Sequence, residues 1–180
     1  MLHLTIPEGE LYNEETGEFL HTKEQKLTLE HSLVSLARWE SKWHKPFLSP
    51  KPKTREESVD YVRCMTLTQN VDPLSYQFLT PALLRQVTEY IEEPMTATTF
   101  SKAEQKKFSR EIITAEIIYY WMISFSIPME CQKWHLARLL TLISVCDRKN
   151  SPGKKMSKKE LYAQNRALNE ARCKARGTRG

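Results

Sequence analysis

The stretch from Ile112 to Met129 constrains the fold more than any other feature of this 180-residue chain. It is the most apolar segment, and Glu116 is its single charged residue. A helix from about Arg110 to Ser126, capped by Ser109, would be apolar on nearly every side, and such a helix belongs in the middle of a bundle. Because the segment is barely long enough to cross a bilayer and contains several hydroxyls and Pro128, we interpret it as a buried helix.

A second apolar segment follows Pro128 at once, and its large side chains recur at helical spacing. Because only one or two residues separate the two helices, we expect an antiparallel hairpin. This pair is predicted to form the centre of the core. The core positions inferred from it and from the helix that begins near His31 are Trp39, Trp43, Ile113, Ile117, Tyr120, Trp121, Trp134, Leu139, Leu142 and Ile143.

Two shorter helices are predicted between residues 31 and 67. Apolar residues recur every three or four positions from His31, and this helix should end before Pro46. The run Thr54–Glu57 is a capping box, in which the threonine side chain and the glutamate side chain each bond to the other's backbone N–H. A helix to about Leu67 should follow it.

Two further helix starts each pair an N-cap residue with a proline at the first helical position. They are Asp72-Pro73 and Thr80-Pro81. The second opens a clearly amphipathic segment that stops at Pro94. The threonine-rich run Met95–Phe100 permits either a strand or a loop.

The first thirty residues predict short strands. Leu2, Leu4 and Ile6 alternate with polar neighbours, and the turn cluster Asn13–Gly17 separates them from two further short runs. Three short strands bury little by themselves, so they must lean on helices. The sequence therefore predicts a mainly α fold, a helical bundle with a small N-terminal antiparallel β-hairpin or sheet.

Charge is divided unevenly along the chain. From Arg148 to Gly180 there are eleven basic and two acidic residues, a net charge of +9, whereas residues 1–147 carry a net charge of −4. Asn150–Gly153 is the clearest boundary. We therefore predict an N-terminal β-hairpin region (1–30), a helical body (31–149) and a basic C-terminal helix and tail (150–180).

The basic C-terminal helix should begin at the capping box Ser157–Glu160, reach about Lys174 and project from the body. Its apolar stripe is too narrow to bury much surface. Three interpretations stay open: a solvated charged helix, a nucleic-acid contact through phosphate neutralisation, or docking onto a protein partner. The candidate partner-binding residues are Leu161, Asn165, Arg166, Leu168 and Arg172.

No catalytic or cofactor-binding motif is found, and we expect a protein that is not an enzyme and needs no cofactor. Cys131 and His135 have the i, i+4 spacing of metal ligands, but two ligands do not make a site, and we expect a buried thiol beside a hydrogen-bonded histidine. His31 and Ser32 lack the glycine-rich elbow of a serine nucleophile, so Ser32 should cap a helix.

Two further patterns have ordinary structural interpretations. An aromatic cluster of Trp39, Trp43 and Phe47 could stack bases, although core packing is the usual role of such a cluster. The four cysteines are widely spaced and form no C-x-x-C pair, which is typical of reduced thiols. The N-terminus shows no secretory signal, and we expect no membrane partner.

Several segments together resemble a family of small proteins that tailed bacteriophages encode in the tail morphogenesis region, the tail assembly chaperones. The segments that carry the resemblance are Glu30–Trp43, Glu111–Met122, Glu130–Ile143, Lys154–Ser157 and Asn165–Asn169.

The resemblance implies a non-enzymatic helper of virion morphogenesis in the host cytoplasm during infection. Such chaperones are thought to coat the tape measure protein, keep its hydrophobic helices soluble and recruit tail tube subunits. In many phages a longer form arises by ribosomal frameshifting, and the region after Asn150 would then be extended or replaced. Self-association, and nucleic-acid binding through the basic tail, stay open. The alternative is a virion structural or DNA-contacting component.

Overall fold

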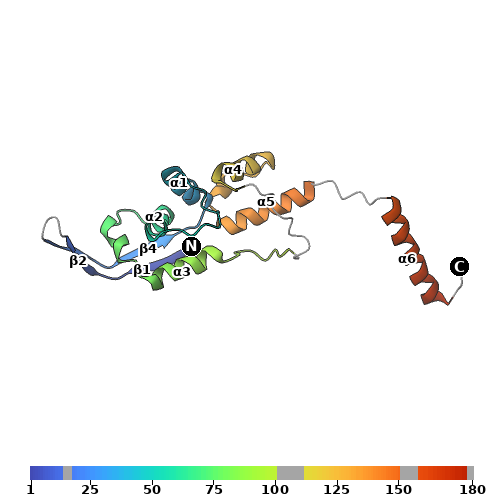
Figure 1. Cartoon of the computed structure of the whole chain (residues 1–180), viewed down its shortest axis with the longest axis horizontal. Coiled ribbons are helices and arrows are strands. Elements are labelled where there is room, and N and C mark those ends of the chain that lie inside the picture. Colours follow the sequence, from blue (N-terminus) through green and yellow to red (C-terminus); the bar gives the residue numbers. More distant parts are fainter. Residues whose placement is uncertain (14–17, 101–111, 151–157, 178–180) are drawn as a thin grey trace. The chain divides into compact units, whose positions relative to one another are not determined.

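The computed structural model describes residues 1–13, 18–100, 112–150 and 158–177. By their internal contacts, the residues form two compact units, Met1–Cys146 and Asp147–Gly180, and each is described by itself. The fold is mainly α-helical with a small N-terminal antiparallel sheet, as the sequence predicted (Figure 1).

Four strands form the N-terminal part of the first unit. They are β1 (Leu2–Ile6), β2 (Gly9–Asn13), β3 (Glu18–Thr22) and β4 (Gln25–Leu29). The chain runs out along β1 and β2 and returns along β3 and β4, so that β1 pairs with β4 and β2 with β3 (Figure 1). The register places Leu4 opposite Leu27, and both side chains are buried. One face of the β1–β4 pair therefore covers the helical core.

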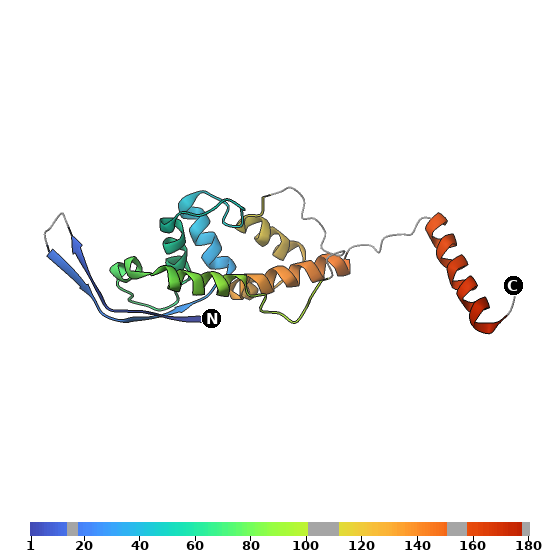
Figure 2. The same cartoon turned by 60° about the horizontal axis from the view of Figure 1, so that its bottom comes forward.

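Helical elements follow the four strands, and among them η marks a 3₁₀-helix. Figures 1 and 2 show their arrangement within the first unit. They are α1 (Leu33–Trp43), α2 (Arg55–Met65), η1 (Pro73–Phe78), α3 (Pro81–Glu92), α4 (Ala115–Ser124), η2 (Met129–Lys133), α5 (Leu136–Asn150) and α6 (Lys158–Arg176).

Local capping explains where four of these elements begin. Ser32 and Thr54 each close a capping box at the start of α1 and α2. Thr80 accepts from the N–H of Leu83 and precedes the proline that opens α3. Asp72 caps in the same way, but the element that follows is the 3₁₀-helix η1.

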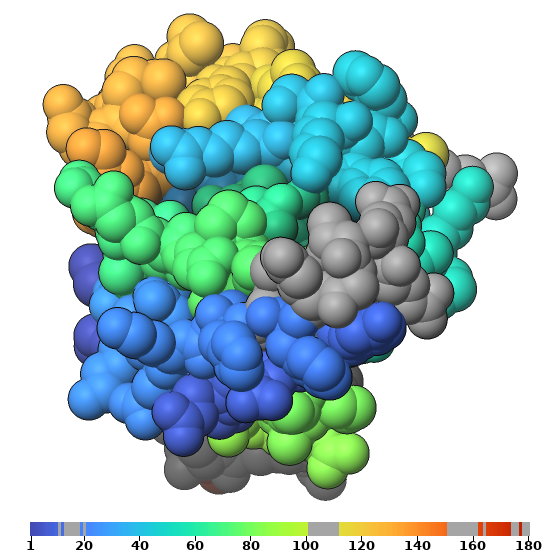
Figure 3. Space-filling view, turned by 90° about the vertical axis from the view of Figure 1, so that its left-hand side faces the viewer, coloured from blue at the N-terminus to red at the C-terminus, as the bar shows by residue number. Residues whose placement is uncertain are grey.

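Helix α1 lies at the centre of the core, where it packs against α2, α4 and η2. Leu36 and Trp39 are almost fully buried, and the Trp39 indole Nε1–H donates to the carbonyl of Glu57 in α2 at 2.9 Å. Figure 3 shows the segment from α1 toward α2 (cyan) beside α4 (yellow), with the strands (blue) next to the green region around η1.

The predicted α4–α5 hairpin is not the centre of the core. Pro128 does not start a long helix, because η2 and an extended Trp134 intervene before α5 begins at Leu136. A β-bridge joins Ser32 to His135, and the Leu136 N–H donates to the His31 carbonyl at 2.7 Å. The start of α5 is thus tied to the start of α1.

The start predicted for the helix of the apolar stretch is also wrong. Ser109 and Arg110 lie outside the described residues, but residues 112–114 are not helical and α4 begins at Ala115. Its N-cap, Thr114, makes no side-chain capping bond. The Glu40 carboxylate of α1 instead accepts from the Ala115 N–H at 2.8 Å.

The predicted core residues have three different environments. Trp39, Leu139 and Ile143 are buried. Tyr120 is 66% exposed, so its assignment to the core was wrong, because only one side of α4 faces α1. Those that are partly buried are Trp43, Ile113, Ile117, Trp121, Trp134 and Leu142.

The second unit contains α6, which ends two residues beyond the predicted Lys174. Ser157 of the predicted capping box lies outside the described residues. None of the described helices is both long and apolar enough to span a membrane.

Candidate partner-binding surfaces

Helix α4 presents large apolar side chains to solvent. Ala115, Ile118 and Met122 face the core at steps of three and four residues. On the opposite side, Tyr120 is 66% exposed and Ile123 is 69% exposed. We call Tyr120 and Ile123 the outer face of α4. A helix that buries one side and exposes aromatic and aliphatic groups on the other is typical of a protein-binding element.

The outer face of α4 has apolar neighbours in the sequence on both sides. Ile112, just before the helix, is 60% exposed, and Met129, at the start of η2, is 45% exposed. Tyr119, next to Tyr120, instead donates from its hydroxyl to Gln132 Oε1 of η2 at 2.9 Å. This bond fastens α4 to η2.

Glu40 fixes the position of α4 against α1. Its carboxylate is 8% exposed and accepts from the Phe47 N–H at 2.7 Å and from the Ala115 N–H at 2.8 Å. A negative charge at the first residue of a helix also stabilises the helix dipole. The orientation of the outer face therefore depends on a side chain from a different helix.

The outer face of α4 could not be predicted from the sequence. An apolar stretch with a single charge predicts burial on all sides, and nothing in it distinguishes an inner from an outer face. The signal that was available is the near absence of charge itself, which is also typical of a surface that another apolar helix covers.

The residues predicted for partner binding lie on α6. Among them, Asn165, Arg166 and Arg172 are exposed, and Leu168 is 47% exposed. Leu161 lies in α6, but the structure does not describe its side chain. The Arg166 guanidinium donates to Glu170 Oε1 at 3.2 Å, an i, i+4 ion pair on the helix surface. Tyr162, at 74% exposure, is a further exposed aromatic side chain of this helix.

His31 and His135 contact each other inside the first unit. The centroids of their rings are 5.1 Å apart in an edge-to-face arrangement, and His31 Nδ1 is 2.6 Å from the Tyr61 hydroxyl. His135 Nε2–H donates to the backbone carbonyl of Tyr90 at 3.1 Å, so Nδ1 of the neutral ring is an acceptor, and it has no partner. The Tyr90 hydroxyl donates to Glu30 Oε1 at 2.8 Å.

Burial keeps both rings neutral. Desolvation, and then the nearby His135, lower the pKa of His31 to about 3. Desolvation is also the largest cause that lowers the pKa of His135, and it raises the pKa of the buried Tyr61 hydroxyl. The pair therefore joins the ends of α1, α3 and α5 as uncharged hydrogen-bonding groups.

Ser32, Cys131 and His135 have structural roles. Ser32 caps α1, as its sequence position predicted. Cys131 is buried in η2, and His135 is hydrogen-bonded. No three His, Cys, Asp or Glu side chains among the described residues are grouped so that they could hold a metal ion. The cysteines of the described chain are free thiols.

The aromatic cluster near α1 is part of the core. Trp39 is 1% exposed and Phe47 is 7% exposed, and the Phe47 and Tyr61 rings are stacked with centroids 3.8 Å apart. The Trp43 indole donates to Asp60 Oδ2 at 2.9 Å. Because Trp39 and Phe47 are buried, these two rings pack within the core, whereas Trp43 is only partly buried.

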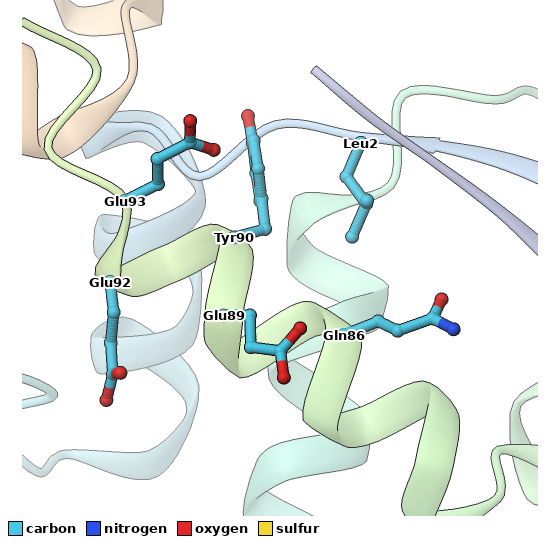
Figure 4. A pocket seen from close by; sticks show the side chains of 6 residues that line it. All are labelled: Leu2, Gln86, Glu89, Tyr90, Glu92 and Glu93. Carbon is cyan, nitrogen blue, oxygen red and sulfur yellow. The ribbon is translucent and has the colours of Figure 1, made fainter.

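A shallow groove runs along α3 beside the first strand (Figure 4). Most of its lining side chains come from α3, and Leu2 comes from β1. It is acidic, and nothing in it indicates a specific ligand. The lining residues are Leu2, Gln86, Glu89, Tyr90, Glu92 and Glu93.

Among the described residues, these observations define a mainly helical protein in which α4 exposes apolar side chains and α6 is a basic exposed helix. Comparison of the chain with protein-family models, curated proteins and solved structures found no match.

Proposed function

We propose that this chain is a non-enzymatic tail assembly chaperone of a tailed bacteriophage. It binds the tape measure protein in the host cytoplasm and helps to recruit tail tube subunits. The observation that carries the proposal is the outer face of α4, where Tyr120 and Ile123 are more than half exposed. An apolar helix of the tape measure protein would cover this face and lose its own exposed apolar surface in the same step.

The expected affinity of one such contact is modest. Complete burial of a tyrosine and an isoleucine contributes only a few kcal/mol at about 25 cal/mol per Å². A weak contact suits a chaperone, because it must leave when the tail tube assembles. Many copies of this chain could still cover one long tape measure protein, because binding sites linked along one partner raise the effective concentration of each site for the next.

Co-expression with the tape measure protein tests the proposal. The chain should raise the soluble fraction of the tape measure protein and co-purify with it. The double variant Tyr120→Ser with Ile123→Ser should lose both effects. Leu67→Ser is the matched control, since it removes another exposed apolar side chain (52% exposed) of the same unit. Unchanged solubility with the unaltered chain, or equal loss in the control, would contradict the proposal.

The charge of the C-terminal segment favours one alternative, a virion structural or DNA-contacting component. Residues 148–180 carry a net charge of +9, and lysine and arginine density is all that phosphate neutralisation requires. DNA affinity should then fall steeply with salt and vanish when the chain is cut after Asn150. DNA binding that is absent, or that does not respond to salt, would remove this alternative.

A further inference from the structure

The sequence of α6 places two leucines at the spacing of a coiled-coil seam. Leu161 and Leu168 are seven residues apart, and Asn165 and Arg172 each follow a leucine by four residues. Alternating steps of four and three place the leucines at d positions and Asn165 and Arg172 at a positions of a heptad. Asn165, Leu168 and Arg172, whose side chains are described, are exposed.

As an isolated helix, α6 is expected to be only marginally stable in water. Its 19 residues are only slightly longer than the length at which isolated helices become marginal in water. The exposed Arg166–Glu170 pair contributes a few tenths of a kcal/mol at most. Packing of the leucine stripe against a second helix is the stabilisation that such a sequence lacks.

The charge of α6 determines which second helix fits. Between Lys158 and Arg176 the helix has six basic and two acidic residues, a net charge of +4. Two copies would bring like charges together along the whole seam, and Arg172 would lie in the seam of both. An acidic helix instead places carboxylates beside these bases, and a polar side chain opposite Asn165 fixes the register.

We propose that α6 pairs with an acidic amphipathic helix of the protein that this chain assists. The leucines of the two helices pack together, and a carboxylate lies opposite Arg172. The inference rests on the proposed function only for the identity of that protein. A nucleic-acid partner would need the positive charge but not leucines at heptad spacing.

Binding of the full chain to designed peptides tests the pairing. The acidic peptide has three heptads with leucine at d, asparagine opposite Asn165, and glutamate opposite Arg172 and at the e and g positions. The matched control peptide has lysine in place of every glutamate. Fluorescence anisotropy at low and moderate salt should show binding of the acidic peptide, weakened by salt, and none of the lysine peptide.

Two variants of the chain examine the seam itself. Leu168→Asp should weaken binding of the acidic peptide roughly tenfold or more, because it removes an exposed leucine that the peptide would cover. Arg172→Glu should weaken it as well, and a peptide with lysine at the facing position should restore affinity. Lys133→Glu, an exposed charge reversal in η2, is the control and should bind as the unaltered chain does.

Several outcomes would overturn the inference. They are equal binding of both peptides, unchanged binding by Leu168→Asp, no rescue of Arg172→Glu, or stable dimers of the chain alone that Leu168→Asp abolishes in sedimentation. Duplex DNA that binds more tightly than the acidic peptide, and equally well to Leu168→Asp, would show a nucleic-acid contact instead. The α4 double variant should keep peptide binding while losing the co-expression effect, so failure of either proposal is distinguishable from failure of the other.

Discussion

Glu40 illustrates how one buried side chain can determine the position of a whole helix. Its carboxylate accepts from the backbone of Phe47, seven residues away, and of Ala115, 75 residues away in the sequence, and so joins the end of α1 to the start of α4. Glu40→Ala would leave two buried N–H groups unpaired, and we expect a loss of about 2–4 kcal/mol in the free energy of unfolding. Urea denaturation measures this loss. The exposed Glu56 is the control, and Glu56→Ala should change the value by less than about 0.5 kcal/mol.

Gly9, at the start of β2, leaves room for an aromatic ring. A Cβ at this position would overlap the Phe78 side chain at the end of η1. Gly9→Ala should therefore lower the free energy of unfolding by about 1–3 kcal/mol. A double-mutant cycle identifies the cause, because Gly9→Ala should cost clearly less when Phe78→Ala is already present. An equal cost in both backgrounds would show that the ring is not the obstacle.

The His31–His135 pair makes the stability of the first unit depend on pH. In the unfolded chain a histidine takes up a proton near pH 6.5, whereas the pKa of folded His31 is about 3. Between these values the unfolded state binds more protons, so the free energy of unfolding falls as the pH falls below 6.5. His31 alone contributes a slope of about 1.4 kcal/mol per pH unit in that range.

Denaturation at several pH values between 7.5 and 5 checks this dependence. The lower limit keeps the measurement above the range where Glu57, Asp60 and Glu116 titrate, since the pKa values of these carboxyls are lowered in the folded state. His31→Gln should flatten the slope, although it also costs stability. An unchanged slope in this variant would exclude His31 as its source.

At the scale of elements, the starts of α1, α2 and α3 could be predicted, whereas the start and the buried face of α4 could not. The signals at Ser32, Thr54 and Thr80 are local, because each cap bonds to an N–H within three residues. Helix α4 has no such signal, since its first N–H bonds to Glu40, 75 residues away in the sequence. The side of α4 that meets α1 is set by that contact and by η2, and neither can be read from the period of the apolar stretch.

The different environments of α4 and α5 lead to opposite expectations for two apolar side chains. Leu139 in α5 is fully buried, and Leu139→Ala should cost about 2–5 kcal/mol in unfolding free energy. Tyr120 on the outer face of α4 is mostly exposed and buries little surface on folding, so Tyr120→Ser should change the free energy of unfolding by less than about 0.5 kcal/mol. Thermal or urea denaturation of the two variants compares them directly. A large loss for Tyr120→Ser would mean that this face is covered within the chain itself.

At the scale of the whole molecule, the sequence indicates the region in which the two compact units divide, but not the residue at which they divide. The turn signal at Asn150–Gly153 and the change in charge indicated where the body ends, yet the compact units divide after Cys146, within α5. A helix can pass from one unit to the next without any change in its apolar period. The contacts between residues determine where a compact unit ends, and the amino-acid composition of a segment is only indirectly related to these contacts.

The first unit should be stable without the second. The most C-terminal side chain of its buried core is Ile143, and the partly buried Cys146 packs against that core, so a chain cut after Asn150 keeps all of α5 and every core residue. We expect its melting temperature to match that of the full chain within about 2 °C, and Leu168→Asp in the full chain to be as neutral. Differential scanning calorimetry measures both. The same truncation should abolish binding of the acidic peptide, because α6 is gone. A fall of many degrees in the truncated chain would show instead that α6 contributes to the stability of the body, and the view of α6 as an arm reserved for a partner would be wrong.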